Sequence, residues 1–346
     1  MFKDQYREVF SQVTASDETK RRILNMTKKR KPRRRIPVGK LIIAAAVVCM
    51  LAVTASAAEF IGGWYVEHFA KQNNEPLNDK QVNFLSDHVQ SYQETQTADK
   101  WTVELQSAIN DGFLGYVVLH VSAPEDVTLG NHLWLGPNSG ILTIPEGVNA
   151  SHSGYWEEDG DGRANTGNYV LEINPNQNTS TIEPFGPDVQ WKIHIADIHT
   201  ESFNEETGMI EVEEILCQGD WDFTFSFANG LEGVELIRTP VETRVEVVGD
   251  TEIGVAGALE AETVTITSFV LKPLSATVVC EPKRVTNYEL DGKMTEVVMK
   301  DGTSIRLDPP AMNMDGEYNL LEAAAPIVLE DVDHILLPDG TVIPMP

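Results

Sequence analysis

The sequence predicts a mainly β protein with short N-terminal helices, one transmembrane helix and, beyond it, two Ig-like β-sandwich modules. Three observations support this fold class. A long apolar segment lies near the N-terminus, a dense basic cluster precedes it, and the remaining chain alternates apolar and polar residues between turns that contain Gly or Pro. With 346 residues, the chain has room for two modest globular units beside these appendages.

Charge is divided sharply along the chain. Residues 1–40 contain 13 Lys and Arg against 4 Asp and Glu, whereas the rest of the chain contains 13 basic and 49 acidic residues. Such asymmetry indicates a membrane or an interaction tail rather than one uniform globule.

The apolar segment predicts a transmembrane helix over residues 36–58. Residues 41–58 carry no charge and span roughly 27 Å as a helix, and residues 36–39 extend them to bilayer thickness. By the positive-inside rule the preceding cations place the N-terminus in the cytoplasm and the C-terminal domains outside the cell. These membrane-anchoring residues are Lys28, Lys29, Arg30, Lys31, Arg33, Arg34, Arg35 and Lys40, joined by Trp64 and Tyr65 where an interfacial aromatic belt is expected.

A cleavable signal peptide is the alternative interpretation of this region. Ala55, Ser56 and Ala57 form the small-x-small pattern that precedes cleavage, here after Ala57. The region before the apolar segment is much longer than an ordinary n-region, which favours an uncleaved anchor and a single-pass protein of the cell membrane. The position of the basic run against the span already explains it, so we expect no direct nucleic-acid binding.

Residues 1–35 predict a cytoplasmic tail of amphipathic helices. Ser16 is a candidate N-cap for a second helix over residues 17–29, with acidic residues in its first turn and basic residues near its end. Two such short helices cannot bury a core of their own, so their apolar face requires a partner or lies on the inner leaflet of the bilayer. The candidate partner-binding residues are Phe2, Tyr6, Val9, Phe10, Val13 and Ile23.

Beyond the span, residues 59–98 predict a juxtamembrane helical stalk, helical over 80–92 and a polar linker over 93–98. Residues 99–232 predict one β-sandwich and residues 240–346 a second, Ig-like one. Strands are expected at 101–106, 113–121, 189–198, 221–227, 241–248, 264–271, 295–300, 304–307, 335–337 and 341–343. Asp-Gly turns at positions 111–112, 301–302 and 339–340 predict three hairpins.

The sequence offers no motif of an enzyme and no catalytic residue. It contains no GxSxG elbow, HExxH helix, P-loop or CxxC pair. Glu157, Asp159, Asp161 and Gly162 resemble the start of a calcium loop, but Asn168 stands where a bidentate Glu is needed, so an acidic surface loop is expected. The spacing of His194 and His199 puts them on opposite faces of a strand, so they should not share a metal. We expect no cofactor and no metal.

The three cysteines are too few for a disulfide scaffold. Cys217 and Cys280 have no spacing signature, and we expect both to be buried and free rather than bridged.

Several segments resemble membrane-anchored anti-sigma-like proteins of Gram-positive bacteria whose outer part is domain of unknown function 4179. The tail YREVFSQVTASDETKRRIL with its basic run and span is similar to the start of that family. KWTVELQSAINDGFLGYVVLHV is similar to its strand, Asp-centred turn and strand, TVTITSFVLKPLSATVV to the opening of its Ig-like module, and VDHILLPDGTVIPMP to its final hairpin. The resemblance implies a signalling protein whose tail holds an extracytoplasmic-function sigma factor. The tail has no zinc-binding His and Cys motif, so this would rest on helix-in-groove contacts.

The sequence is therefore compatible with two functions. In the first, the chain is an anti-sigma factor with a sigma factor as cytoplasmic partner and an unknown extracellular ligand. In the second, it is a cell-envelope protein whose acidic β-sandwiches contact wall polymer, protein or cation, with the tail as a simple bilayer anchor.

Overall fold

The computed structural model describes residues 63–130, 133–136, 141–148, 150–157, 163–175, 189–204, 209–227, 231–237, 239–248, 259–283, 286, 288–309 and 319–346. All of them lie in one compact unit. This part of the chain is mainly β, as predicted, with a helix over residues 63–73 and the helix α4 (Asp79–His88). The predicted tail and the predicted span over residues 36–58 lie outside the described residues. Within the described residues no helix is both long enough and apolar enough to cross a bilayer.

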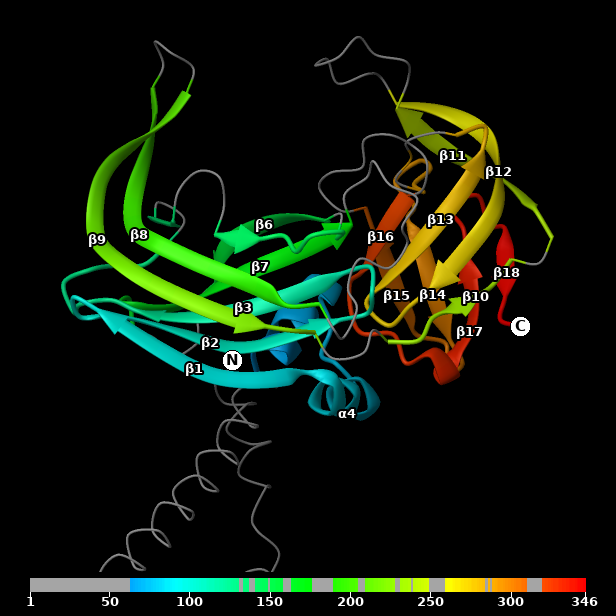
Figure 1. Ribbon diagram of the computed structural model, residues 1–346. Helices are drawn as coiled ribbons and strands as arrows, with labels where there is room; N and C mark the ends of the chain where they lie inside the picture. Colours follow the sequence, from blue (N-terminus) through cyan, green and yellow to red (C-terminus); the bar gives the residue numbers. More distant parts are fainter. Residues whose placement is uncertain are drawn as a thin grey trace, which may run out of the picture. The chain divides into compact units, whose positions relative to one another are not determined.

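Two sheets form the first module, defined here as residues 90–227 (Figure 1). The five-stranded sheet has the order β1 (Gln90–Ala98), β2 (Trp101–Asn110), β3 (Gly115–Ser122), β7 (Thr166–Pro175) and β6 (Ala150–Glu157). The second sheet contains β4 (Leu133–Leu135), β5 (Leu142–Thr143), β8 (Trp191–Asn204) and β9 (Met209–Phe225), with β8 paired to the other three. One apolar cluster draws its residues from both sheets, so the module is a sandwich about a shared core.

The alternation along β9 shows why this core forms. Trp221, Phe223 and Phe225 are buried, whereas Asp222 and Thr224 between them are exposed. Because side chains of a strand point alternately to its two faces, the aromatic residues enter the core together and the polar ones face outward. The predicted strand pattern is therefore confirmed here.

The second module, defined as residues 234–344, is one nine-stranded antiparallel sheet. Its main order is β10 (Val234–Glu235), β12 (Leu259–Leu271), β13 (Ser275–Glu281), β16 (Asn319–Ala323), β15 (Ser304–Asp308), β14 (Thr295–Met299), β17 (Val332–Leu336) and β18 (Val342–Pro344), and β11 (Val241–Val248) pairs with β12. A single core contains residues from strands at both ends, such as Val245 of β11 and Ile343 of β18. The sheet must therefore curl about its own core. The N–H of Arg244 donates to Asp339 Oδ2 at 2.8 Å and links β11 to the β17–β18 turn.

The hairpins predicted from Asp-Gly pairs are confirmed. β2 and β3 flank Asp111, β14 and β15 flank Asp301, and β17 and β18 flank Asp339. The following glycines have φ values of 91°, 87° and 92°, a left-handed conformation that glycine adopts at little cost.

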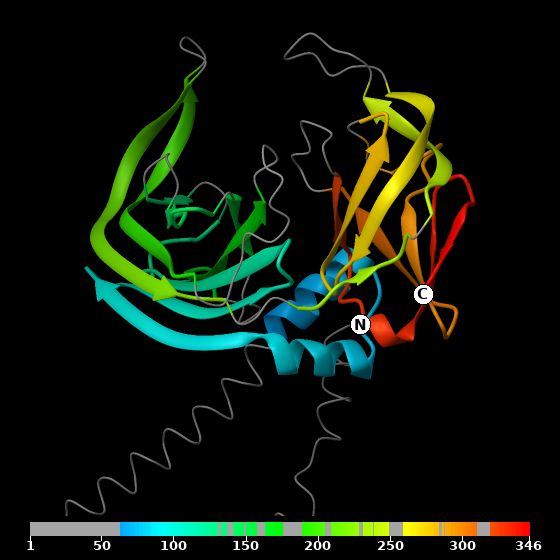
Figure 2. The same cartoon turned by 45° about the vertical axis from the view of Figure 1, so that its right-hand side comes forward.

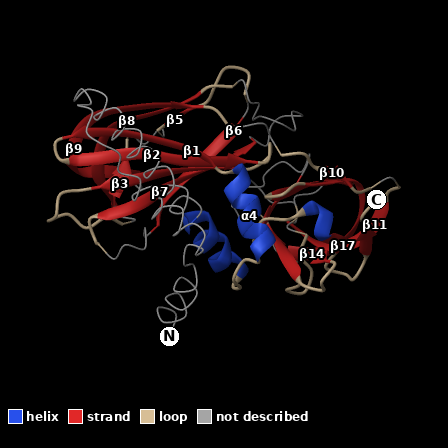
Figure 3. Ribbon diagram, turned by 90° about the horizontal axis from the view of Figure 1, so that it is seen from below, coloured by secondary structure: helices blue, strands red, loops and turns tan. Residues whose placement is uncertain are grey.

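The stalk predicted over residues 59–98 differs from the structure. Residues 93–98 form part of β1, which pairs with β2 along the sheet, instead of a polar linker. The helix over residues 63–73 and α4 are packed against the sheet rather than free. Figures 2 and 3 show both helices beside the strands. The polar sequence of β1 hid its strand character because an edge strand buries little of its surface, so its burial pattern lacks a clear alternation.

A third apolar cluster explains why these helices are docked. Trp64, Tyr65 and Phe69 of the first helix and Leu85 of α4 pack with residues of β2, β3 and β7 and with Leu274 of the second module. The five-stranded sheet is thus covered on both faces, by the other sheet and by the helices. This accounts for the nearly continuous burial of β3.

Candidate functional site

The helix over residues 63–73 is fixed to the first module by one carboxylate. Trp64 and His68 are four residues apart and therefore lie on one face of the helix. Trp64 Nε1 donates to Glu157 Oε2 at 2.8 Å, and His68 Nδ1 lies 3.1 Å from Glu157 Oε1. The two rings stack with centroids 4.7 Å apart. Glu157, at the end of β6, thus contacts two successive turns of the helix.

The environment of Glu157 favours its charged form. Burial alone would raise its pKa, but the hydrogen bond and charge of His68, the charge of Lys71 and the hydrogen bond from Trp64 outweigh burial, so the pKa is lowered. Glu157 was the first member of the candidate calcium loop. Asp159, Asp161 and Gly162 lie outside the described residues, and Asn168 is buried in β7. The structure gives Glu157 a different role, as acceptor for the helix.

A second carboxylate joins the same helix to the second module. The hydroxyl of Tyr116 on β3 donates to Glu322 Oε1 on β16. The side chain of Gln72, on the helix, also hydrogen-bonds Glu322. Glu322 therefore holds three elements together: the helix, the five-stranded sheet and the second module.

The environment of Glu322 favours its neutral form. Burial, followed by the charge of Glu172 on β7, raises its pKa to about 7. Tyr116 is fully buried, and burial and the charge of Glu322 raise its pKa far above the usual range. The pKa of Tyr155 is also raised, chiefly by burial and then by the charges of neighbouring glutamates. We use the name helix junction for Trp64, His68, Tyr116, Glu157 and Glu322.

Asp111 makes a further link between the modules. Its Oδ1 accepts from the N–H groups of Phe113 and Leu114, both at 2.9 Å, and so closes the β2–β3 turn. Its Oδ2 accepts from Leu274 N at 3.0 Å and from Ser275 Oγ at 2.7 Å. The residue is fully buried, and burial raises its pKa although these hydrogen bonds and the charge of Lys272 oppose the rise. One side chain thus organises a turn and docks the second module on it.

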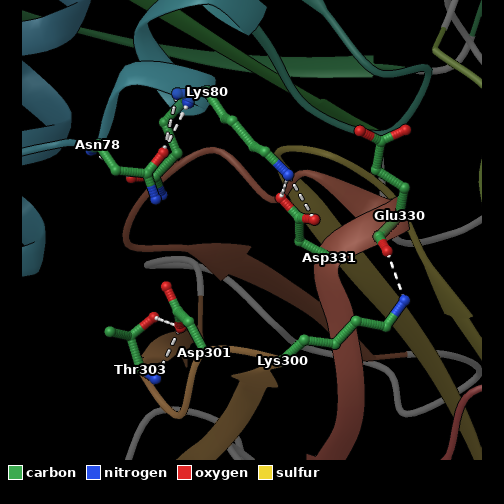
Figure 4. A network of polar contacts seen from close by, with 8 residues as sticks. Asn78, Lys80, Lys300, Asp301, Thr303, Glu330 and Asp331 are labelled. Atoms are coloured by element: carbon green, nitrogen blue, oxygen red, sulfur yellow. Dashed lines mark hydrogen bonds and ion pairs between the residues drawn. The ribbon is translucent and has the colours of Figure 1, made fainter.

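Helix α4 touches the second module next to this region. Asn78 caps the helix by accepting from Lys80 N and Gln81 N, and Lys80 Nζ lies 2.6 Å from Asp331 Oδ2 (Figure 4). The side chain of Gln81 is buried and donates from Nε2 to the carbonyl of Pro326 at 2.9 Å. Lys300 Nζ donates to Glu330 O and supports the segment that carries Asp331.

These contacts define what the helix junction does. Glu157 stabilises the docked helix when it is ionised, and Glu322 stabilises it best when it is protonated. The contacts described here do not form a nucleophile–base pair. The two carboxylates are positioned to hold the helix against both modules.

The sequence-predicted site residues fall into two groups. Trp64 is 8% exposed and Tyr65 is fully buried. Their rings therefore fill the protein core instead of facing a lipid interface, because the aromatic face of this helix packs on the sheet. The others lie outside the described residues: Phe2, Tyr6, Val9, Phe10, Val13, Ile23, Lys28, Lys29, Arg30, Lys31, Arg33, Arg34, Arg35 and Lys40.

The two strand histidines are not brought together. His194 is half exposed and lies beside Asp222, whereas His199 is buried between Asp197 and Glu201, at 2.7 and 3.2 Å. Cys217 and Cys280 are buried and not joined in a disulfide, as expected, and each lies in the core of a different module.

Sequence reasoning did not find the carboxylates of the helix junction. Glu157 and Glu322 belong to a chain with 53 acidic residues, and no local pattern separates them from the rest. The Asp111–Gly112 pair did predict the turn, but the buried contact of Asp111 with Ser275 depends on residues 164 positions apart.

The described residues place the chain among mainly β proteins, and comparison adds little to this. No family model matches the sequence, and no curated protein matches it. Among solved structures, it is similar to one described as the crystal structure of the conserved domain protein from Bacillus anthracis. The two share 12% identity over 72% of this chain and 76% of the other, with a TM-score of 0.43.

Proposed function

We propose that this chain is a single-pass membrane signalling protein, an anti-sigma factor that holds an extracytoplasmic-function sigma factor through its N-terminal helices. In this proposal residues 36–58 span the membrane and two Ig-like β modules lie outside the cell. The basic cluster before residue 41, the uncharged segment after it and the family resemblance support the topology.

The observation that best supports a signalling role is the helix junction. The helix over residues 63–73 begins a few positions after the proposed span and is fixed to the first module by Glu157 and to the second by Glu322. A ligand that moves one module against the other would change the hold on this helix, and the covalent chain would pass the change to the span. A signalling protein needs an element with two states between the part that receives the signal and the part that responds to it.

The cytoplasmic output in this proposal is a helix-in-groove contact. By helical spacing of the sequence, the first predicted tail helix would present Val9 and Phe10 on its apolar face and Ser11 and Ala15 on the opposite face. Replacing Val9 and Phe10 by Asp should therefore release the sigma factor, whereas Ser11→Asp with Ala15→Asp adds the same charge without touching the contact.

Crosslinking in native cells, pull-down of the full-length chain and mass spectrometry test this proposal. Recovery of a sigma factor with the wild type and with the Ser11/Ala15 control, and its loss on deletion of residues 2–27 or with the Val9/Phe10 variant, would support it. Recovery of envelope components alone, unchanged by the deletion, would instead favour a cell-envelope binding protein whose tail is an anchor.

The role of the helix junction has its own readout. Glu157→Ala should change transcription from sigma-factor-dependent promoters and, in parallel, the amount of sigma factor recovered with the chain. Glu125→Ala, which removes an exposed carboxylate from the same module, serves as the control. Equal transcription in both variants would remove the helix junction from the signalling path.

A further inference from the structure

Three side chains on the outer face of the first module converge on one point. His194 of β8 and Asp222 of β9 are direct cross-strand partners, so their side chains project from the same face of the sheet. Asp220 lies two residues before Asp222, at a register shift of the β8–β9 ladder, and its carboxylate lies 3.7 Å from His194 Nδ1. The neighbouring Trp221, Ile193 and Ile195 are buried in the core, which turns the three polar side chains outward. Figure 1 shows β8 and β9 side by side along this ladder.

The distances among the three donor groups suit a metal ion. His194 Nδ1 lies 2.9 Å from Asp222 Oδ1 and 3.7 Å from Asp220 Oδ1, and one donor atom of each residue lies within 4.8 Å of the others. Bonds of about 2.0–2.2 Å to Zn²⁺ place neighbouring donor atoms of a tetrahedral site roughly 3.4 Å apart. The observed contacts lie on either side of that spacing, so small side-chain rotations would complete three corners of a tetrahedron.

We propose that His194, Asp220 and Asp222 bind a divalent transition-metal cation of the Zn²⁺ class, with water as the fourth ligand. One imidazole with two carboxylates favours Zn²⁺ and its neighbours in the first row over Ca²⁺ or Mg²⁺, which prefer all-oxygen sites with more ligands. The inference does not depend on the proposed signalling function. It also differs from the sequence-based expectation of no metal, which considered His194 only together with His199.

The backbone beneath the site is held by a third strand. The side chain of Gln96 on β1 accepts from Asp222 N at 2.9 Å and donates to Asp222 O. Asp222 is therefore fixed by both β8 and β1. Donor groups on paired strands keep their geometry better than groups on loops, so less order must be gained on binding. The excess of acidic residues in this part of the chain also raises the local concentration of cations.

The plain alternative is a surface His–Asp ion pair without a metal, and the chain provides a matched example. His334 Nδ1 lies 2.8 Å from Asp333 Oδ2, nearly the same distance as in the His194–Asp222 pair. Within the described residues this second pair has no third ligand group that would complete a metal site. It thus reproduces the ion pair and lacks the proposed site.

Isothermal titration of the purified full-length chain with ZnCl₂, and with CaCl₂ as the oxygen-preferring probe, tests the proposal. We expect one equivalent of Zn²⁺ that Ca²⁺ does not displace, and a loss of affinity of about tenfold or more in His194→Gln, Asp220→Asn and Asp222→Asn. His334→Gln should bind as the wild type does. Far-UV circular dichroism of each variant checks that the fold is kept, which the exposure of all three side chains leads us to expect.

The visible absorption of bound Co²⁺ is a second measurement. It would not change in the variants if the three site residues had only a structural role. The wild type should show the visible absorption of a tetrahedral Co²⁺ complex, and His194→Gln should lack it while His334→Gln keeps it. Absence of Zn²⁺ binding, an unchanged affinity in all three site variants, or an equal loss in His334→Gln would overturn the assignment.

Discussion

Trp64 donates its indole N–H to Glu157 across 2.8 Å, although 93 positions separate the two residues in the chain. The same carboxylate contacts His68 with its other oxygen. This contact fixes the first described helix to the edge strand β6 of the five-stranded sheet.

Removing the Glu157 carboxylate should loosen the helix. Glu157→Ala leaves the buried Trp64 N–H without its acceptor, which should lower the free energy of unfolding by about 1–3 kcal/mol. Urea denaturation of the full chain, followed by Trp fluorescence, measures the change. Glu125→Ala removes an exposed carboxylate and should leave the midpoint unchanged. Equal midpoints for the two variants would mean that the contact contributes nothing.

Stability should depend on pH through Glu322. Because its pKa is raised from the usual 4.5 to about 7, the folded chain binds this proton more tightly than the unfolded chain does. The resulting stabilisation is complete below pH 4.5 and is lost as the pH rises through about 7. Its upper limit is about 3–4 kcal/mol, from about 1.4 kcal/mol for each pKa unit.

Glu322→Gln isolates that contribution because glutamine stays neutral at every pH. The variant should be more stable than the wild type at pH 8 and no more stable at pH 4, as measured by urea denaturation at both pH values. Glu330→Gln removes an exposed charge near α4 and should keep the wild-type pH dependence, since Glu330 contacts Lys300 through its backbone carbonyl. An unchanged pH profile in Glu322→Gln would contradict the role of this carboxyl.

Asp111 and Ser275 should show strong energetic coupling. Ser275→Ala removes one hydrogen bond to a buried carboxylate, for an expected loss of about 1.5–3 kcal/mol, and Asp111→Ala should cost more because it also frees Leu274 N–H. A double-mutant cycle on unfolding free energies should give a coupling of about 1–2 kcal/mol. The matched control is the same double-mutant cycle on Asp301 and Thr303. In that pair Asp301 accepts from Thr303 in an exposed Asp-Gly turn. Additive effects of the Asp111 and Ser275 variants would show that the two side chains act independently.

Gln81 should contribute more than the neighbouring ion pair. Its side chain is buried, donates to the Pro326 carbonyl and accepts from Asn78 N, so Gln81→Ala should destabilise the chain by about 1–2 kcal/mol. Lys80→Ala breaks only the solvent-exposed contact with Asp331 and should leave the unfolding midpoint unchanged. Thermal unfolding of the two variants measures both effects. A larger loss of stability in Lys80→Ala than in Gln81→Ala would contradict this ranking.

The pattern of the sequence determined a good part of the β architecture. Period-two alternation located β9 at Trp221, and the Asp-Gly turns at Asp111 and Asp339 located two of the hairpins. These features are local, because a turn residue or an inward-facing side chain is specified within a few positions. The short strands β4 and β5 and the polar strand β1 escaped prediction because their local sequences carry little of that signal.

The sequence by itself determined the mainly β character and the hairpins at the Asp-Gly turns. Only the tertiary structure decided that Trp64 and Tyr65 enter a core, that Glu157 accepts from the helix, and that Tyr116 meets Glu322 across 206 positions. The physical reason is that turns and strand periodicity follow from neighbouring residues, whereas the partner of a buried polar group is set by which distant elements pack together.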